Sequence, residues 1–179
     1  FIGEGQGTTL TVLAVNTSRA HLKDKTVRQA LQYAVSGQEI IDTVYRGRGF
    51  EVDSLFPKWH PGYYKAEASE IALIRQDQAK SKALLAKAGY GPGKPLKVEL
   101  QTFPAPAHVE RSVVLQAQFN AVGIEVEVRN IPSGTVLSNL QGGNYDLVLY
   151  QINKGPTVAE FTWDLYTSES SANYTFYNK

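Results

Sequence analysis

The stretch that most constrains the fold runs from Pro95 to Gln151, where two kinds of hydrophobic spacing alternate. The segments Leu96–Leu100 and Ile124–Arg129 alternate apolar and charged residues, which is typical of strands with one buried face. The segment Tyr145–Tyr150 is almost continuously apolar, as expected of a strand covered on both faces. Helical spacing separates the three segments. The order strand–helix–strand–helix–strand predicts an α/β sheet layer.

Two helices are expected between these strands. The first spans about Val109 to Val122, with Val113 on its apolar side. The second begins with Ser133 as its N-cap and ends at the glycine pair 142–143. Earlier in the chain, Thr8 to Val15 has the composition of a strand.

Three more helices are indicated upstream of Pro95. One spans Thr26 to Val35, and a second begins at a capping box in which Ser36 is followed by Glu39. These two helices are expected to meet at a corner near Ser36. A third helix begins at Asp77 and ends at Gly89.

Ligands of open α/β sheets bind beyond the carboxyl ends of the strands. This rule directs attention to the segment from Tyr150 to Pro156. It brings together Tyr150, Gln151, Asn153 and Lys154, whose side chains exchange hydrogen bonds with small polar ligands. A plain loop at the end of a strand is an equally good interpretation of these residues.

Bulk composition narrows the classes of function. The chain has 179 residues, of which 42% are hydrophobic and 20% charged, as in an ordinary globular domain. Its net charge of +1 is too balanced to indicate nucleic acid or a membrane surface as a partner. No apolar run approaches the roughly 18–20 residues of a membrane span.

The residues give no sign of catalysis or of a resident metal. Cysteine is absent, which excludes disulfides, thiolate ligands and a cysteine nucleophile. His21, His60 and His108 fall in expected loops without a compact metal-ligand spacing. No G-x-S-x-G elbow occurs. We therefore expect no enzyme, no cofactor and no bound metal, with turnover by an unrecognised site as the alternative.

Several segments together resemble a known family, the extracytoplasmic solute-binding proteins of ABC importers that handle oligopeptides, dipeptides and nickel chelates (family 5). The likeness covers roughly Thr8 to Tyr177, and Ser81 departs from it where the family usually has alanine. The matching segments, in chain order, are Asn16-Thr17, Val27-Arg28-Gln29-Ala30-Leu31, Asp77 with Leu84-Leu85, Ala88-Gly89-Tyr90, Gly123-Ile124-Glu125-Val126 and Tyr145-Asp146.

The resemblance implies a periplasmic-binding-protein-like fold (type II, class C), with a mixed central sheet flanked by helices. It implies that residues 1–179 form a single domain, the second or C-terminal lobe of a protein that closes on its ligand like a hinged clamp. Since the sequence contains no methionine, we expect it to be part of a longer chain. One lobe is one wall of the cleft, so we expect weak binding by it alone.

The resemblance also implies a function. The expected role is the substrate-binding component of an ABC transporter, which captures peptides or a similar small polar solute outside the cytoplasmic membrane. The expected partners are that ligand and the permease subunits, with no nucleic acid. The expected location is the periplasm or the outer face of the membrane, with attachment through the permease or a lipid anchor outside this chain. The alternatives are a nickel- or metal-chelate receptor of the same family and a solute-sensing regulatory domain.

In peptide-binding members, an aspartate a few residues before a proline in the loop after the last strand anchors the α-amine of the peptide. The corresponding segment here, residues 153–156, contains no acid, and a cationic amine beside Lys154 would be repelled. This favours a different anchor or an anionic solute. Asn173 and Tyr174 are further ligand-binding candidates, because a Ser/Asn segment follows this loop in the family.

Overall fold

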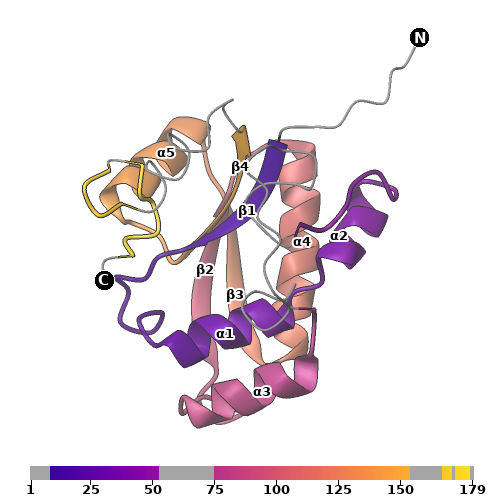
Figure 1. Cartoon of the computed structure of the whole chain (residues 1–179), viewed down its shortest axis with the longest axis vertical. Coiled ribbons are helices and arrows are strands. Elements are labelled where there is room, and N and C mark those ends of the chain that lie inside the picture. Colours follow the sequence, from indigo (N-terminus) through magenta and orange to yellow (C-terminus); the bar gives the residue numbers. More distant parts are fainter. Residues whose placement is uncertain (1–8, 53–74, 154–166, 171, 178–179) are drawn as a thin grey trace.

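A computed structural model describes residues 9–52, 75–153, 167–170 and 172–177 of the chain (Figure 1). Lys154 and the Asn153 side chain lie outside the described part. The described elements, in chain order, are β1 (Thr9–Val15), α1 (Lys25–Ala34), α2 (Gly37–Val44), α3 (Gln78–Lys87), β2 (Leu96–Thr102), α4 (Pro106–Ala121), β3 (Ile124–Asn130), α5 (Ser133–Gly142) and β4 (Leu147–Asn153).

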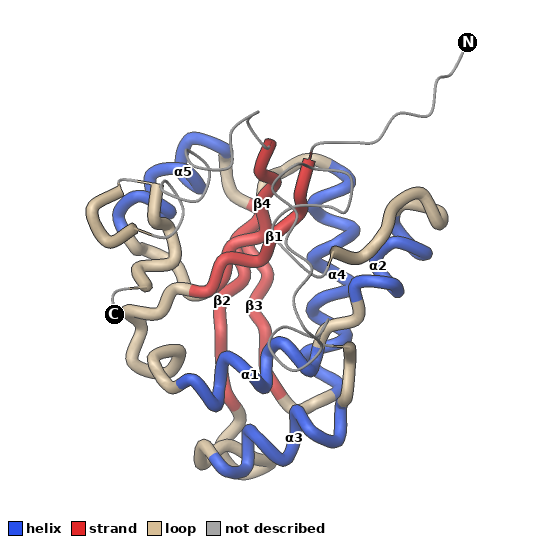
Figure 2. Tube along the Cα trace, viewed as in Figure 1, coloured by secondary structure: helices blue, strands red, loops and turns tan. Residues whose placement is uncertain are grey.

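The four strands form one mixed sheet in the order β1-β4-β2-β3 (Figure 2). Strands β2, β3 and β4 run parallel, while β1 runs antiparallel to β4. The connection through α4 covers one face of the sheet and the connection through α5 covers the other. The expected α/β fold with a mixed sheet flanked by helices is thus confirmed.

Strand β4 occupies the interior position that its apolar sequence predicts. It lies between β1 and β2, and Leu147, Val148 and Leu149 are all buried. Successive side chains of a strand point to opposite faces, so a strand covered on both sides is apolar at every position. Leu147 and Leu149 accordingly face α4, while Val148 faces α5.

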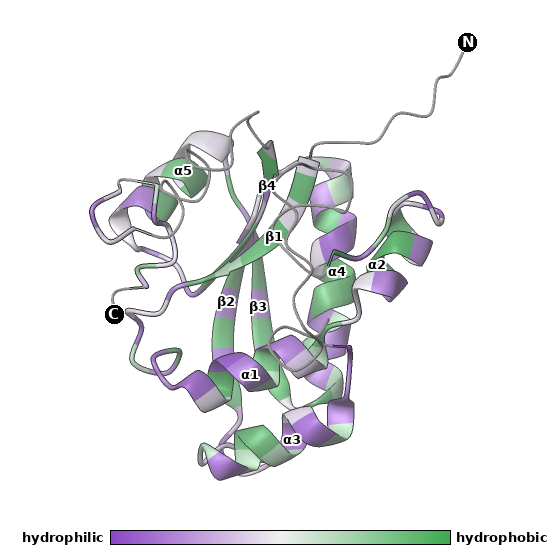
Figure 3. Ribbon diagram, viewed as in Figure 1, coloured by the Kyte–Doolittle hydropathy of each residue, from purple (hydrophilic) through white to green (hydrophobic). Residues whose placement is uncertain are grey.

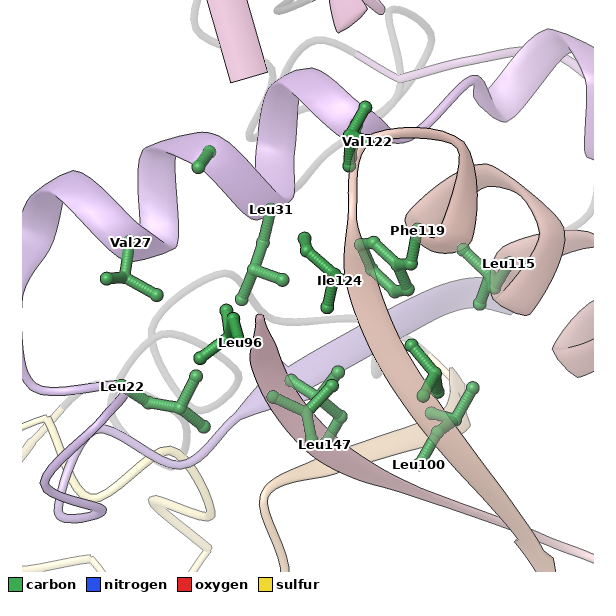
Figure 4. Packing of buried hydrophobic residues seen from close by; sticks show 14 of the residues in the cluster. Leu22, Val27, Leu31, Leu96, Leu100, Leu115, Phe119, Val122, Ile124 and Leu147 are labelled. Carbon is green, nitrogen blue, oxygen red and sulfur yellow. The ribbon is translucent and has the colours of Figure 1, made fainter. Parts of the chain in front are cut away.

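The larger core fills the face of the sheet that carries α4 (Figure 4). Phe119 of α4 packs there with the strand residues Leu100 and Ile124, and all three side chains are fully buried. Burial of one such side chain contributes about 2 kcal/mol. Helices α1 and α3 extend this layer toward the amino ends of the parallel strands, through Val27, Leu31 and Leu85.

The smaller core lies between the opposite face of the sheet and α5. It contains Val136 and Leu140 of α5 together with Val148 of β4. The segment 172–177 closes it from the side. The Phe176 ring lies so near Gly143 that a Cβ added there would come within 3.1 Å of a ring carbon. Gly143 also has φ +70°, so both space and backbone conformation require glycine at the end of α5.

The starts of α1, α2 and α3 were predicted, whereas two other helix starts were not: α4 begins at Pro106 rather than at about Val109, and α5 has a different N-cap. The side chains of Asp24, Ser36 and Asp77 cap α1, α2 and α3 by accepting backbone N–H bonds. The prediction that Ser133 caps α5 is wrong, since Pro132 takes the cap position and Ser133 is the first helical residue. The Pro132 carbonyl accepts the first backbone bonds of this helix, which has no side-chain cap.

Helix α4 buries a more polar side than its sequence suggests. Val113 is 57% exposed, whereas Arg111, Ser112 and Gln118 are buried. Gln118 is buried because its amide forms hydrogen bonds with the corner between α1 and α2. Its Oε1 accepts from the Ser36 backbone N–H at 3.1 Å, and its Nε2 donates to Ser36 O at 3.2 Å and to Glu39 Oε2 at 2.7 Å. The expected corner at Ser36 is therefore present, and α4 holds it.

Asn16 ties the end of β1 to the start of β4. Its side chain is buried, and its Nδ2 donates to Gly143 O and to Tyr145 O, each at 3.0 Å. Its Oδ1 accepts from the backbone N–H and the hydroxyl of Ser18, at 3.0 and 2.7 Å. All the strong hydrogen-bonding positions of the amide are therefore used.

We predict that Asn16→Asp lowers the free energy of unfolding by about 3 kcal/mol, because a carboxylate replaces the amide N–H groups that donate to Gly143 O and Tyr145 O. Tyr145 O keeps its second bond, from Arg19 Nε at 3.0 Å, whereas Gly143 O then faces a negative charge. Urea unfolding followed by circular dichroism measures the change. Asn130→Asp is the control, since Asn130 is exposed at the end of β3. Equal losses in the two variants would contradict the role given to the Asn16 amide.

Candidate functional site

The carboxyl ends of β2, β3 and β4 lie at one edge of the sheet, together with the start of β1. From β2 the chain passes through α4 to β3 on one side, and then returns through α5 to β4 on the other side. The order of strands therefore reverses between β2 and β4, and such a switch point is where α/β sheets bind ligands. Thr102 stands beside Leu149 at this point.

Tyr150 and Tyr174, two of the predicted site residues, meet on the α5 face of this edge. Their ring centroids are 6.2 Å apart with the planes at 73°, an edge-on contact. Phe103 and Ile131 pack against the same cluster. The strand end and the segment 172–177 thus present an aromatic surface next to the switch point.

Gln151 lies on the opposite face, as alternation along β4 requires. It is exposed and stands across from Thr11 of β1, so the two side chains share the α4 face. Arg111 of α4 donates from Nη1 to Thr11 Oγ1 at 2.8 Å. The Gln151 amide is therefore next to the strand residue that receives the guanidinium.

Arg111 is a fixed positive charge inside the protein, with 1% of its surface exposed. Its Nε donates to Ala107 O at 2.8 Å, and its guanidinium carbon lies 5.7 Å from the centre of the Tyr45 ring. Burial lowers the pKa of Arg111, and the interaction with Tyr45 opposes that change. The guanidinium thus contacts residues of α4, β1 and the end of α2, close to the edge of the sheet where the parallel strands end.

His108 was expected in a loop, and this prediction is wrong. It lies in the first turn of α4, and its ring centroid is 5.2 Å from that of Phe103. Burial lowers the pKa of His108 below 6.5, and the charge of Arg111 lowers it further. The imidazole is therefore neutral near pH 7, and no described residue forms a hydrogen bond with its buried Nδ1.

Asn173 uses its side chain to shape its own segment. The Nδ2 donates to Thr167 O and Tyr177 O, each at 3.2 Å, and the Oδ1 accepts from Thr175 Oγ1 at 3.0 Å. A second tie, from the Thr17 backbone and hydroxyl to Thr175 O, fixes the segment to the chain after β1. Asn173 thus positions Tyr174, and a ligand role for its amide stays a prediction.

Ligand roles for Asn153 and Lys154 stay predictions. Asn153 is the last residue of β4, paired with Thr9 of β1, so its backbone reaches the carboxyl edge. The described residues at this edge, 9–11, 102–108, 130–134 and 150–153, include no aspartate or glutamate. Within the described part of the chain, no group of three or more His, Cys, Asp or Glu side chains is placed to hold a metal ion.

Charged side chains gather instead at other places on the sheet. Asp146, at the start of β4, has its Oδ1 3.3 Å from His21 Nε2 and 3.6 Å from Arg19 Nε. On the open face of β2 and β3, Arg129 bonds Glu99 at 2.8 Å. Burial alone would raise the pKa of Glu99, but hydrogen bonds from Arg129 and Gln101 lower it. These pairs secure the sheet away from the candidate edge.

The residues that sequence reasoning missed, Arg111 and His108, share one signal. Both are polar residues in or beside a stretch read as the apolar side of a helix. Arg111 occurs four residues after Ala107, whose carbonyl it binds along the helix. Its contact with Thr11 joins positions 100 residues apart, so no local sequence pattern could predict it.

Comparison with known proteins gives consistent likenesses. The family model described as bacterial extracellular solute-binding proteins, family 5 Middle, matches residues 3–174. The chain is 29% identical over 151 residues to the dipeptide-binding protein of Escherichia coli K12, an alignment covering 82% of this chain and 27% of that protein. It is 27% identical over 152 residues to the nickel-binding periplasmic protein of the same organism, covering 78% of this chain and 28% of that protein.

Among solved structures, NikA from Staphylococcus aureus in complex with Ni(L-His)2 is similar at a TM-score of 0.85 and 25% identity. The match covers 97% of this chain and 36% of NikA. The chain thus spans little more than a quarter of the length of the two curated relatives.

The neutral state of His108 makes stability depend on pH. The unfolded imidazole takes up a proton below its ordinary pKa of 6.5 while the folded one resists it, so the free energy of unfolding falls as pH drops through this range. We predict that lowering the pH from about 7.5 to about 5.5 destabilises the wild type more than His108→Gln. Parallel urea melts at the two values measure this, and identical pH slopes would refute it. Glu99 acts in a separate window, below pH 4.5.

Proposed function

Because the chain belongs to the bacterial extracellular solute-binding proteins of family 5, we propose that it is part of the substrate-binding component of an ABC importer. The family match over residues 3–174 carries this proposal. The protein acts outside the cytoplasmic membrane, in the periplasm or at its outer face. It captures a peptide or a similar small polar solute and delivers it to the permease subunits. The work is binding, and no catalytic step is assigned to it.

The chain forms one lobe of the receptor, which we assign as the second, C-terminal lobe over residues 1–179. The carboxyl edge of the sheet supplies one wall of the cleft, with Tyr150, Gln151 and Tyr174 on it and Asn153 and Lys154 following in sequence. The opposite wall comes from another part of the full protein. Because enclosure by two walls provides most of the affinity, this lobe alone binds weakly.

The chemistry of the described edge bears on the class of solute. Its described residues offer aromatic rings, amides and a buried guanidinium, and they include no carboxylate to pair with the α-amine of a peptide. A peptide therefore takes its amine anchor from elsewhere in the protein. A nickel or other metal chelate is the second candidate, favoured by the likeness to the two nickel-binding relatives. With no metal cluster in the described part, the metal would arrive with its own ligands.

Native mass spectrometry of the full-length protein, purified without added ligand, separates these candidates. We expect a ladder of small peptide masses that disappears after denaturation and refolding. A single discrete mass with the isotope pattern of nickel would move the assignment to the chelate receptor. Retention of no solute, together with failure to bind any peptide or chelate in a panel, would contradict a capture function.

The Tyr150–Tyr174 pair gives a residue-level test on the full-length protein. Tyr174→Ala removes one ring of the pair, and we predict about a fivefold to tenfold weaker affinity for the solute that mass spectrometry identifies. Tyr177→Ala is the matched control, because this tyrosine lies in the same segment and is 42% exposed. Isothermal titration calorimetry measures both. Equal affinities for the two variants would remove Tyr174 from the site.

A further inference from the structure

The balanced net charge of the chain conceals a strong separation of charge. Residues 17–35 and 75–97 carry ten lysines and arginines against two aspartates, a balance of +8. The rest of the chain carries eight cations against fifteen carboxylates, a balance of −7. These two cationic stretches contain α1, α3 and the turn that leads into β2.

The fold brings the two stretches together. Helices α1 and α3 lie side by side at one end of the molecule, and the hydroxyl of Ser81 in α3 donates to Ala30 O in α1 at 2.8 Å (Figure 1). This end lies at the amino ends of β2 and β3, opposite the carboxyl edge. Figure 3 shows hydrophilic residues on both helices, and the lysines at positions 25, 80, 82 and 87 are exposed. We call this surface the cationic layer; its members are Lys23, Lys25, Arg28, Lys80, Lys82, Lys87 and Lys94.

The charges of the cationic layer are not neutralised by described neighbours. Arg19, Arg75 and Lys97 of the same stretches form ion pairs with residues outside them, but the seven members of the layer form none with a described residue. The two aspartates, Asp24 and Asp77, are occupied as N-caps of α1 and α3.

Three members of the layer do have neutral partners, and one of them, Lys94, has its Nζ 5.8 Å from the centre of the Tyr90 ring. Arg28 donates to the carbonyls of Leu22 and Lys23, and Lys80 donates to the Tyr33 hydroxyl at 2.7 Å. These bonds orient the side chains without cancelling their charge. Among the residues that the structure describes, no carboxylate therefore pairs with the positive charges of this layer.

The composition of the layer favours an anionic lipid surface over a protein partner. Six of its seven members are lysines, which are depleted in protein interfaces, where arginine and aromatic anchors dominate. The large exposed hydrophobic residues of the described part, Phe50, Val113, Leu137 and Tyr177, all lie elsewhere. Lysines on a surface without apolar anchors suit diffuse attraction to anionic headgroups, which is additive and salt-sensitive.

We propose that the cationic layer of α1 and α3 associates peripherally with the anionic phospholipid surface of the membrane outside which the protein works. None of the described helices combines the length and apolar character that crossing a bilayer requires. The lysines of the layer make the proposed contact an electrostatic one. The layer and the carboxyl edge lie at opposite ends of the lobe, so membrane contact leaves the edge facing away from the bilayer. This orientation suits capture of solute rather than its delivery.

The test is co-sedimentation of the full-length protein with phosphatidylcholine vesicles that contain or lack phosphatidylglycerol. We expect binding only to the anionic vesicles, at about 0.02 M salt, and its loss at about 0.5 M salt. The variant Lys25→Glu/Lys82→Glu reverses two exposed members of the layer, and we expect it to bind at least about tenfold more weakly. Both lysines are exposed, and neither side chain forms a hydrogen bond or ion pair with a described residue. We expect solute affinity to be unchanged, which separates this result from failure of the capture function.

The matched control is Arg46→Glu/Arg48→Glu, which makes the same change in net charge after α2, outside the layer. Retained vesicle binding by this control, with loss in the lysine variant, supports the cationic layer. Equal loss in both variants would show a net-charge effect and overturn the proposal. It is also overturned if the wild type binds neutral and anionic vesicles alike, or binds neither.

Discussion

The buried amide of Asn16 is the interaction on which the arrangement of the sheet depends most directly. It joins the end of β1 to the turn before β4 with two donated bonds, while its oxygen shapes the loop that leads to α1. Strand β1 is the only antiparallel strand of the described sheet, so its register has to be fixed at one of its ends. Fixing it at Asn16 sets Thr11 opposite Gln151 at the far end, where the guanidinium of Arg111 arrives. A polar contact at one end of the sheet therefore determines the alignment of the candidate edge at the other.

The register between β1 and β4 also gives the carboxyl edge of the sheet different chemistry on its two faces. On the α5 side it carries the aromatic pair of Tyr150 and Tyr174, and on the α4 side it carries the Gln151 amide near Arg111. A solute at the switch point would meet rings on one side and hydrogen-bonding groups on the other, which suits a small polar molecule with some apolar surface. The asymmetry follows from the alternation of β4, since neighbouring residues of one strand cannot share a face.

Periodic features of the fold were predictable from sequence, and long-range contacts were not. The strands around Leu100, Val126 and Leu149 were found because period-two or continuous apolar spacing records burial directly. The polar side of α4 was missed because burial of Gln118 and Arg111 depends on partners at Ser36 and Thr11, which lie far away in the chain. At the site, the strand end at Tyr150 could be predicted from the topology. Its contact with Tyr174 depends on how residues 172–177 fold back, and the bonds of Asn173 that hold this turn have no periodic signature.

The net charge of a chain predicts its binding partners less well than hydrophobic spacing predicts its strands and helices. A sum of +1 averages over the chain, whereas a partner meets only one surface. The packing of α1 on α3 concentrates lysines because both helices use their small and apolar residues, such as Ala30 and Leu85, against the core and turn their charged residues outward. The two capping aspartates offset only two of the ten positive charges that residues 17–35 and 75–97 carry. Formation of a buried core on one side of this helix pair thus creates the charged layer on the other, at the end of the sheet opposite the candidate site.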